Sequence, residues 1–116
     1  MDEYFDNFLI LDKFNVSRET FSTLNEFRKK IIEKNNEINL ISTKSASNSM
    51  NRHIIDCAQV IDLIDINSKT CTDIGSGAGL PGIVLSILLR DRKIDMKMNL
   101  YEKSYRKSLF LRSVSK

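Results

Sequence analysis

The chain has 116 residues, which suits one domain with a real hydrophobic core but is short for a large enzyme fold. Its 41% hydrophobic and 28% charged composition is that of an ordinary globular protein, no apolar run approaches the roughly 20 residues of a membrane span, and the acidic N-terminus is unlike a signal peptide. These features predict a cytoplasmic protein. Two cysteines exclude a disulfide framework and a single histidine argues against a zinc centre, so no metal is expected. Cys57 and Cys71 are expected to be small buried apolar residues.

The net charge of +3 is unevenly distributed. Residues 90–116 contain nine Lys and Arg against three Asp and Glu, whereas residues 1–89 contain nine against twelve. A basic C-terminal third suits contact with phosphates, and a solvated helix face explains the same charge equally well.

The N-terminal half predicts helices. A short helix is expected around residues 3–13, and a longer one from the N-cap Ser17 to about Asn36, with apolar positions at Phe21, Leu24, Phe27 and Ile32. The polar, serine-rich residues 39–49 are expected to form a connecting loop. A further amphipathic helix carries apolar residues at spacings of four and three: Met50, Ile54, Cys57, Ile61 and Ile64.

From residue 69 onward the pattern becomes β-α-β-α. Residues 71–74 suit a short strand, residues 83–89 a nearly all-apolar buried helix, and residues 96–101 a second strand. Ser104 can cap a final helix that carries Leu109, Phe110 and Val114. The order predicts the start of a doubly wound α/β sheet in residues 69–116, behind an N-terminal helical segment in residues 1–68.

All four glycines and the only proline lie in one stretch, TDIGSGAGLPGI, at residues 72–83. Glycines between a strand and its helix permit positive φ and let a ligand approach the backbone. Pro81 fits the first turn of the helix, whose free N–H groups favour an electron-rich group. The stretch therefore predicts a ligand-binding crevice at the carboxyl end of the first strand.

Three interpretations of this loop are open. Read from Gly77, it matches the dinucleotide pattern GxGxxG, but the strand ends too early for a nicotinamide cofactor. Read from the strand, Asp73 precedes the glycines and suits the cationic methionine end of S-adenosylmethionine, while Glu102 ends the second strand and can accept hydrogen bonds from ribose hydroxyls. A glycine turn with only a structural role is the third interpretation.

Several other polar and aromatic residues are expected to have structural roles. Arg52, His53 and Asp56 are expected to tie the N-terminal helices to the loop, with contact to RNA or cofactor as the alternative. Tyr101, Tyr105 and Phe110 are expected in the core or against the sheet rather than as stacking platforms for bases.

Four parts of the sequence carry a resemblance to a known family: Asn35 with Asn39-Leu40, Arg52-His53-Ile-Ile-Asp56, DIGSGAGLPGI, and EKSYRKSLFLRSV. Together they resemble the small-subunit ribosomal RNA guanine-N7 methyltransferases, called RsmG or GidB, over nearly the whole chain. Two positions depart from the family pattern: Lys34 stands where Trp is usual, and Cys57 where Ser is usual.

The resemblance implies a Rossmann-like class I methyltransferase that uses S-adenosylmethionine and acts on 16S ribosomal RNA. The implied cofactor-binding residues are Asp73, Gly75, Ser76, Gly77, Gly79, Leu80 and Glu102. The RNA-binding residues expected with them are Arg52, Arg106, Lys107 and Arg112. No catalytic residue is expected, because guanine N7 is a lone-pair acceptor with no proton to remove.

The family has a sheet of seven strands, and this chain provides two. We therefore expect residues 69–116 to be the first half of the cofactor domain, in a fragment, a separately expressed half, or a decayed and non-catalytic RNA-binding remnant. Such a chain should bind the cofactor very weakly and transfer no methyl group. It should also self-associate through apolar surface left on residues 83–89 and 109–114.

Overall fold

The computed structural model describes residues 14–40 and 50–115, without the side chains of residues 50–52. The helix expected at residues 3–13 and most of the connection expected at 39–49 lie outside the described residues. The elements in chain order are α2 (Arg18–Asn35), α3 (Met50–Ala58), the 3-10 helix η1 (Gln59–Leu63), β1 (Thr70–Ile74), α4 (Gly82–Asp91), β2 (Lys97–Tyr101) and α5 (Tyr105–Val114).

Helix α2 forms as the periodicity predicts. Its N-cap is Ser17, whose side chain accepts a hydrogen bond from the Thr20 N–H. Leu24, Phe27 and Ile31 are buried one turn apart on the face toward the core. The expected helix over residues 17–36 is therefore confirmed.

The second amphipathic helix is shorter than expected. Regular α-helix ends at Ala58, and the chain continues as η1 to Leu63. The stripe is confirmed in part, since Ile54 and Ile61 are buried while Ile64 is half-buried. Three residues per turn in η1 shift the side chains off a 3.6-residue stripe, and Leu63 is left 84% exposed.

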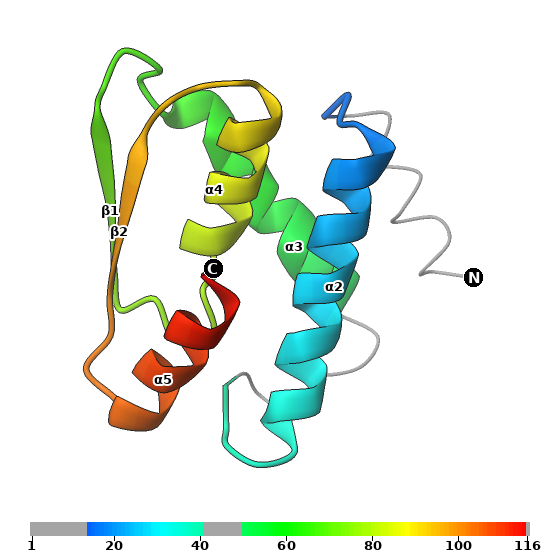
Figure 1. Cartoon of the computed structure of the whole chain (residues 1–116), viewed down its shortest axis with the longest axis vertical. Helices are drawn as coiled ribbons and strands as arrows, with labels where there is room; N and C mark the ends of the chain where they lie inside the picture. The colour runs from blue at the N-terminus through cyan, green and yellow to red at the C-terminus, as the bar shows by residue number, and fades with distance from the viewer. Residues whose placement is uncertain (1–13, 41–49, 116) are drawn as a thin grey trace.

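The two strands form a parallel sheet, in register from Thr70 opposite Lys97 to Ile74 opposite Tyr101. Figure 1 shows α4, α5, α3 and α2 together on one side of this sheet, with α4 next to the strands. The described residues thus contain a parallel β-α-β unit followed by a helix. The α/β class is confirmed, and the sheet seen here is a two-stranded one rather than a complete Rossmann sheet.

Helix α4 occupies the centre of the core. Its apolar side chains pack between the sheet and helices α2 and α3, and those that are buried are Ile83, Val84, Leu85, Leu88 and Leu89. The expectation of unpartnered apolar surface on residues 83–89 is wrong, because the N-terminal helices cover this helix. On α5, Phe110 and Leu111 are buried and Leu109 is 45% exposed.

Two tyrosines lie outside the core. Tyr101 and Tyr105 are 61% and 75% exposed, so the expectation that they pack in the core is wrong, whereas it is confirmed for Phe110. Tyr101 ends β2 opposite Ile74. The preceding residue, Leu100, lies against Gly82 of α4, and side chains alternate along a strand, so Tyr101 is on the other face of the sheet. Cys57 and Cys71 are half-buried free thiols rather than fully buried ones.

A polar contact joins α2 to α4. Asp91, the last residue of α4, accepts hydrogen bonds from the Ser17 N–H and the Ser17 and Thr20 hydroxyls. Burial by itself raises the pKa of Asp91, but these hydrogen bonds outweigh it and the pKa lies below its usual value. Among the described helices, none has the length and hydropathy needed to cross a bilayer.

Candidate functional site

The glycine loop, residues 75–81, lies between the carboxyl end of β1 and the start of α4. Gly75, Gly77 and Gly79 have φ values of +74°, +56° and +92°, which confirms the positive φ expected of them. The N–H groups of Gly75 and Ser76 both donate to the Tyr101 carbonyl at the end of β2. The loop is therefore fixed where both strands end, the edge at which open α/β sheets bind ligands.

The four glycines serve two different purposes. A Cβ built on Gly75 or Gly77 meets nothing within 4 Å, so these two face open space. A Cβ on Gly79 would lie 2.6 Å from Ile83 Cδ1, and one on Gly82 would lie 2.6 Å from Asp73 Oδ2. Gly75 and Gly77 thus provide accessible backbone, while Gly79 and Gly82 allow close packing.

Ser76 shapes the loop from within. Its side chain is 2% exposed, and its hydroxyl donates to the Asp73 carbonyl at 3.0 Å. Its own carbonyl accepts the N–H groups of Gly79 and Leu80. The sequence pattern placed Ser76 among cofactor contacts, and the geometry gives its side chain a structural part in the turn.

Asp73 joins the strand to the following helix. Its Oδ2 accepts the Gly82 N–H at 3.0 Å, so one of the helix-start amides expected to face a ligand is already paired. Pro81 precedes α4 rather than standing in its first turn, and the Leu80–Pro81 peptide is cis. The second carboxylate oxygen of Asp73 retains acceptor capacity beside the loop.

Glu102 connects three parts of the site. Its Oε1 accepts the Gly77 N–H at 2.7 Å and its Oε2 accepts the Ser104 N–H at 2.8 Å. These bonds from Ser104 and Gly77 hold the pKa of Glu102 below its usual value. The structure therefore brings Glu102, Asp73 and the glycine loop together, as the sequence predicted, although 25 residues separate Gly77 from Glu102.

The Cys57 thiol is close enough to this site for the charge of Asp73 to affect its pKa. Burial, with smaller contributions from the charges of Asp56 and Asp73, raises the pKa of the Cys57 thiol to about 11. The thiol is protonated at neutral pH, so it is a poor nucleophile. The described residues hold no group of three or more His, Cys, Asp and Glu side chains arranged for a metal.

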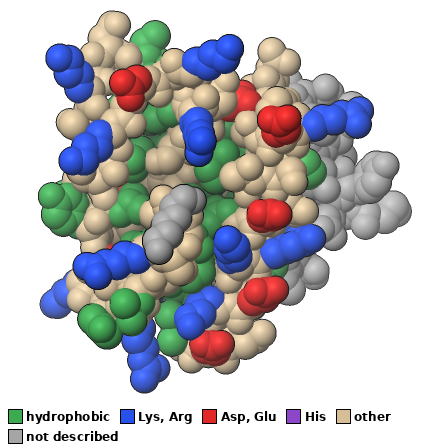
Figure 2. All heavy atoms as spheres, in the orientation of Figure 1, with side chains coloured by type: hydrophobic (Ala, Val, Ile, Leu, Met, Phe, Trp, Pro, Cys, Tyr) green, Lys and Arg blue, Asp and Glu red, His purple; other side chains and the backbone are tan. Residues whose placement is uncertain are grey.

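The residues expected to bind RNA are spread over the molecule. Arg106 and Lys107 lie in the first turn of α5, near Glu102, while Arg112 is exposed in its last turn. Arg52 belongs to α3, and its side chain lies outside the described residues. Figure 2 shows Lys and Arg side chains on both sides of the junction between α5 and α2, with acidic side chains along α2.

Sequence reasoning missed one side of this basic surface. Lys30 and Lys34 of α2 face Arg106 of α5 across a cavity of about 540 Å³. The only signal in the sequence was the helical spacing of two lysines, which by itself does not show which helix lies opposite.

Comparisons with known proteins identify the family. The family model for rRNA small subunit methyltransferase G (GidB) matches residues 20–116. A protein named ribosomal RNA small subunit methyltransferase G from Pelagibacter ubique is 47% identical over 118 positions, covering 100% of this chain and 55% of its own length. Proteins of the same name from Parvibaculum lavamentivorans and Rickettsia akari are 38% and 43% identical, covering 88% and 87% of this chain and 45% and 50% of their own.

No solved structure shows significant similarity to the chain. The chain spans about half the length of the curated relatives it matches. The family match covers far more than half of the residues and includes the whole glycine loop and both strands. The resemblance seen in the motifs is thus confirmed, and the chain belongs to the rRNA small subunit methyltransferase G family.

Proposed function

We propose that this chain supplies the methyl-donor site of an S-adenosylmethionine-dependent methyltransferase whose acceptor is N7 of a guanine in 16S ribosomal RNA. The observation that carries the proposal is the glycine loop at the carboxyl ends of two parallel strands, with accessible backbone at Gly75 and Gly77. The carboxylates of Asp73 and Glu102 flank that backbone. The names of the relatives support ribosomal RNA as the substrate class.

The residues present fit the cofactor. A Cβ on Gly75 or Gly77 would meet nothing within 4 Å, so a ligand can approach the backbone closely at these two positions. Glu102 uses one acceptor position on each oxygen, and a carboxylate has about four, so it can bind ribose hydroxyls while still holding the loop. Asp73 likewise keeps an oxygen for an ammonium group. When bound, the cofactor supplies an electrophilic methyl group on a sulfonium.

The protein's part in this chemistry is alignment. Guanine N7 already carries the lone pair that attacks, so no side chain has to remove a proton. Close packing against the loop backbone and hydrogen bonds to the two carboxylates would fix the donor, and holding both reactants in line lowers the barrier. A general base and a metal are not part of the proposed mechanism.

Contacts to RNA are assigned by the same proposal to Arg106, Lys107 and Arg112, with Arg52 of α3 as a further candidate. Both Arg106 and Lys107 lie in the first turn of α5, directly after the loop that carries Glu102. Arg106 is exposed and Lys107 is half-buried. A phosphate held there would lie beside the donor site.

The nicotinamide alternative has weaker support. A dinucleotide fingerprint needs a strand that runs up to its first glycine, which would be Gly77, whereas β1 ends at Ile74. Titrating S-adenosylmethionine and a nicotinamide cofactor separately against a full-length protein that carries this chain distinguishes the two. The other alternative, a non-catalytic RNA-binding remnant, predicts RNA binding with no response to either cofactor.

The test is Gly77→Val in a full-length protein that carries this chain, with S-adenosylmethionine binding measured by titration calorimetry. A β-branched side chain is strained at a φ of +56°, and it would project into the open space where the ligand is proposed to approach, so binding should be lost. Thr72→Val on the exposed face of β1 is the matched control and should leave affinity unchanged. Unchanged affinity in a folded Gly77→Val protein would refute this loop as the donor site.

A further inference from the structure

A groove runs between the C-terminal part of α2 and α5. Its wider part, about 540 Å³, is lined by Lys30 and Lys34 of α2 and by Arg106 and Phe110 of α5. Its narrower part, about 340 Å³, is lined by Asn36, Asn39, Arg106 and Lys107, among others. Because Glu37, Ile38 and Arg106 border both parts, they form one continuous α2–α5 groove.

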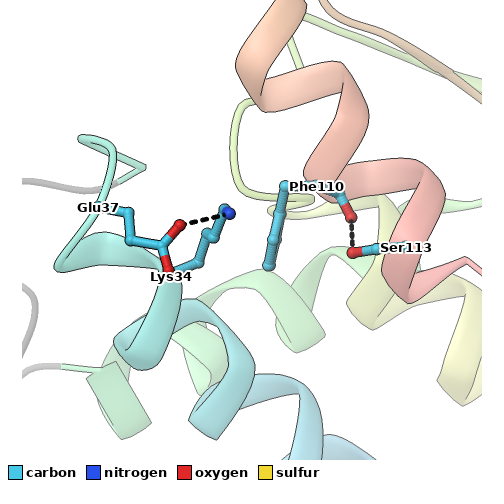
Figure 3. Close-up of polar contacts among 4 residues, drawn as sticks. All are labelled: Lys34, Glu37, Phe110 and Ser113. Atoms are coloured by element: carbon cyan, nitrogen blue, oxygen red, sulfur yellow. Dashed lines mark hydrogen bonds and ion pairs between the residues drawn. The ribbon is translucent and has the colours of Figure 1, made fainter.

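The side chains along the α2–α5 groove favour a polyanion. Four cationic side chains, Lys30, Lys34, Arg106 and Lys107, face two carboxylates, Glu33 and Glu37. The carboxylate of Glu37 is bonded at 2.7 Å to Lys34, which lowers the pKa of Glu37 (Figure 3). Lys34 therefore compensates Glu37, and the remaining charge is positive.

The floor and rim of the groove differ in chemistry. Figure 3 shows the ring of Phe110 standing between Lys34 on one side and Ser113 on the other. Phe110 is only 4% exposed, so it forms an apolar floor rather than a free stacking face. Asn36 and Asn39 are exposed at the narrow end, where side-chain amides can pair with the donor and acceptor groups on base edges.

The narrow end of the groove meets the donor site. Ser104 lines it, and the Ser104 N–H donates to Glu102, whose other oxygen holds the Gly77 N–H. One residue thus separates the groove from the glycine loop. A ligand lying along the groove would end where the methyl donor is proposed to bind.

We propose that the α2–α5 groove binds a single-stranded RNA segment and leads its target nucleotide to the glycine loop. Lys30 and Arg106 contact phosphates, and the amides of Asn36 and Asn39 contact bases. Both cavity volumes fall in the range of about 300–1,000 Å³ that proteins use for small ligands, which suits individual nucleotides better than a duplex. This assignment rests on the proposed function, because it takes RNA as the substrate.

The experiment uses a full-length protein that carries this chain and compares Lys30→Gln/Arg106→Gln with a matched control, Arg92→Gln/Lys97→Gln. The control removes the same charge at the opposite end of the strands. Binding of a fluorescent single-stranded RNA is followed by anisotropy from low to moderate salt. S-adenosylmethionine binding and thermal unfolding of each protein are measured in parallel. Loss of two phosphate contacts should reduce the slope of log affinity against log salt concentration by about 1.4 and weaken RNA binding at least tenfold. The control should bind RNA as the wild type does.

The outcomes separate the two proposals. A weaker affinity and smaller slope in the groove variant alone, with cofactor binding intact, support the α2–α5 groove. Equal weakening in both variants, displacement of RNA by polyglutamate at matched charge, or a wild-type chain that binds no RNA would overturn it. Wild-type protein that binds RNA through the groove but no S-adenosylmethionine would leave the groove standing and refute the proposed function.

Discussion

At the scale of single residues, Gly82 shows how closely α4 approaches the strands. A Cβ at this position would overlap the side chains of Leu100 and Asp73. The Gly82 N–H also donates to Asp73, so the missing side chain is what lets the carboxylate reach the helix start. The fourth glycine of the sequence is thus a packing residue, unlike Gly77, which faces open space.

Gly82→Ala should destabilise the protein by about 1–3 kcal/mol, since the methyl group must displace Asp73 and Leu100 in a packed region. Chemical denaturation measures the change. Ser86→Ala, at a half-buried position of the same helix, is the control and should cost less than about 0.5 kcal/mol. Equal stability of the two variants would show that α4 can shift away from the sheet without cost.

Glu102 gives a second residue-scale prediction. Its pKa is lowered in the folded protein by the Ser104 and Gly77 amides, so its contribution to stability is present above the pKa of an unfolded glutamate and is lost as pH falls through the folded value. The stability difference between wild type and Glu102→Gln should be full at pH 7 and decline below about pH 4.3.

Thermal unfolding at constant ionic strength, scanned from pH 7 to pH 3, checks the Glu102 prediction. Glu26→Gln makes the same charge change on the exposed part of α2 and should not show the decline. A Glu102→Gln difference that is independent of pH would mean that the carboxylate does not hold the glycine loop in solution.

At the scale of elements, Asp91 links the start of α2 to the end of α4, residues separated by more than 70 positions. It holds the N-cap residue Ser17 and Thr20 in place by hydrogen bonds and supplies a negative charge at the N-terminus of α2, where the helix dipole favours it. Asp91→Ala should therefore lower the free energy of unfolding by about 1–2 kcal/mol.

Denaturant titration of Asp91→Ala against Asp95→Ala, an exposed residue of the α4–β2 connection, checks this prediction. Asp91→Asn, which keeps an acceptor oxygen, should fall between wild type and Asp91→Ala. If Asp95→Ala is as destabilising as Asp91→Ala, general charge rather than the contact with Ser17 and Thr20 is responsible.

At the scale of the whole molecule, one face of the sheet carries large exposed apolar groups. Ile74 and Tyr101 lie opposite each other in the register and are 83% and 61% exposed. Parallel sheets are usually covered on both faces, and unpaired strand edges add a second route to association. The chain should therefore run larger than a monomer on size exclusion.

Light scattering after size exclusion tests whether the chain associates through the exposed sheet face that carries Ile74 and Tyr101. Ile74→Thr/Tyr101→Thr should shift the chain toward the monomer, because threonine keeps strand preference while removing most of the apolar area. Leu63→Thr, at a residue 84% exposed on η1, should not. A monomeric wild-type chain, or an equal shift in both variants, would rule out the open sheet face as the contact.

Most of the elements and the character of the site could be predicted from the amino-acid sequence. Hydrophobic periodicity predicted α2, α4 and both strands, because a helix or strand buries one face with a fixed spacing. Concentration of all glycines in one stretch located the loop, and the carboxylates at the strand ends predicted that Asp73 and Glu102 would meet there. These inferences need only local spacing and the rule that parallel strands end at the same edge.

Features that depend on partners distant in the sequence became clear only from the folded chain. The hydrogen bonds of Asp73 and Glu102, the burial of Ser76 and the exposure of Tyr101 follow from how the loop, the strands and α5 meet. The burial of α4 depends on α2 and α3, and the α2–α5 groove on the approach of two helices about 70 residues apart in the chain. Local pattern shows which face of an element is apolar, but packing alone selects the element that covers it.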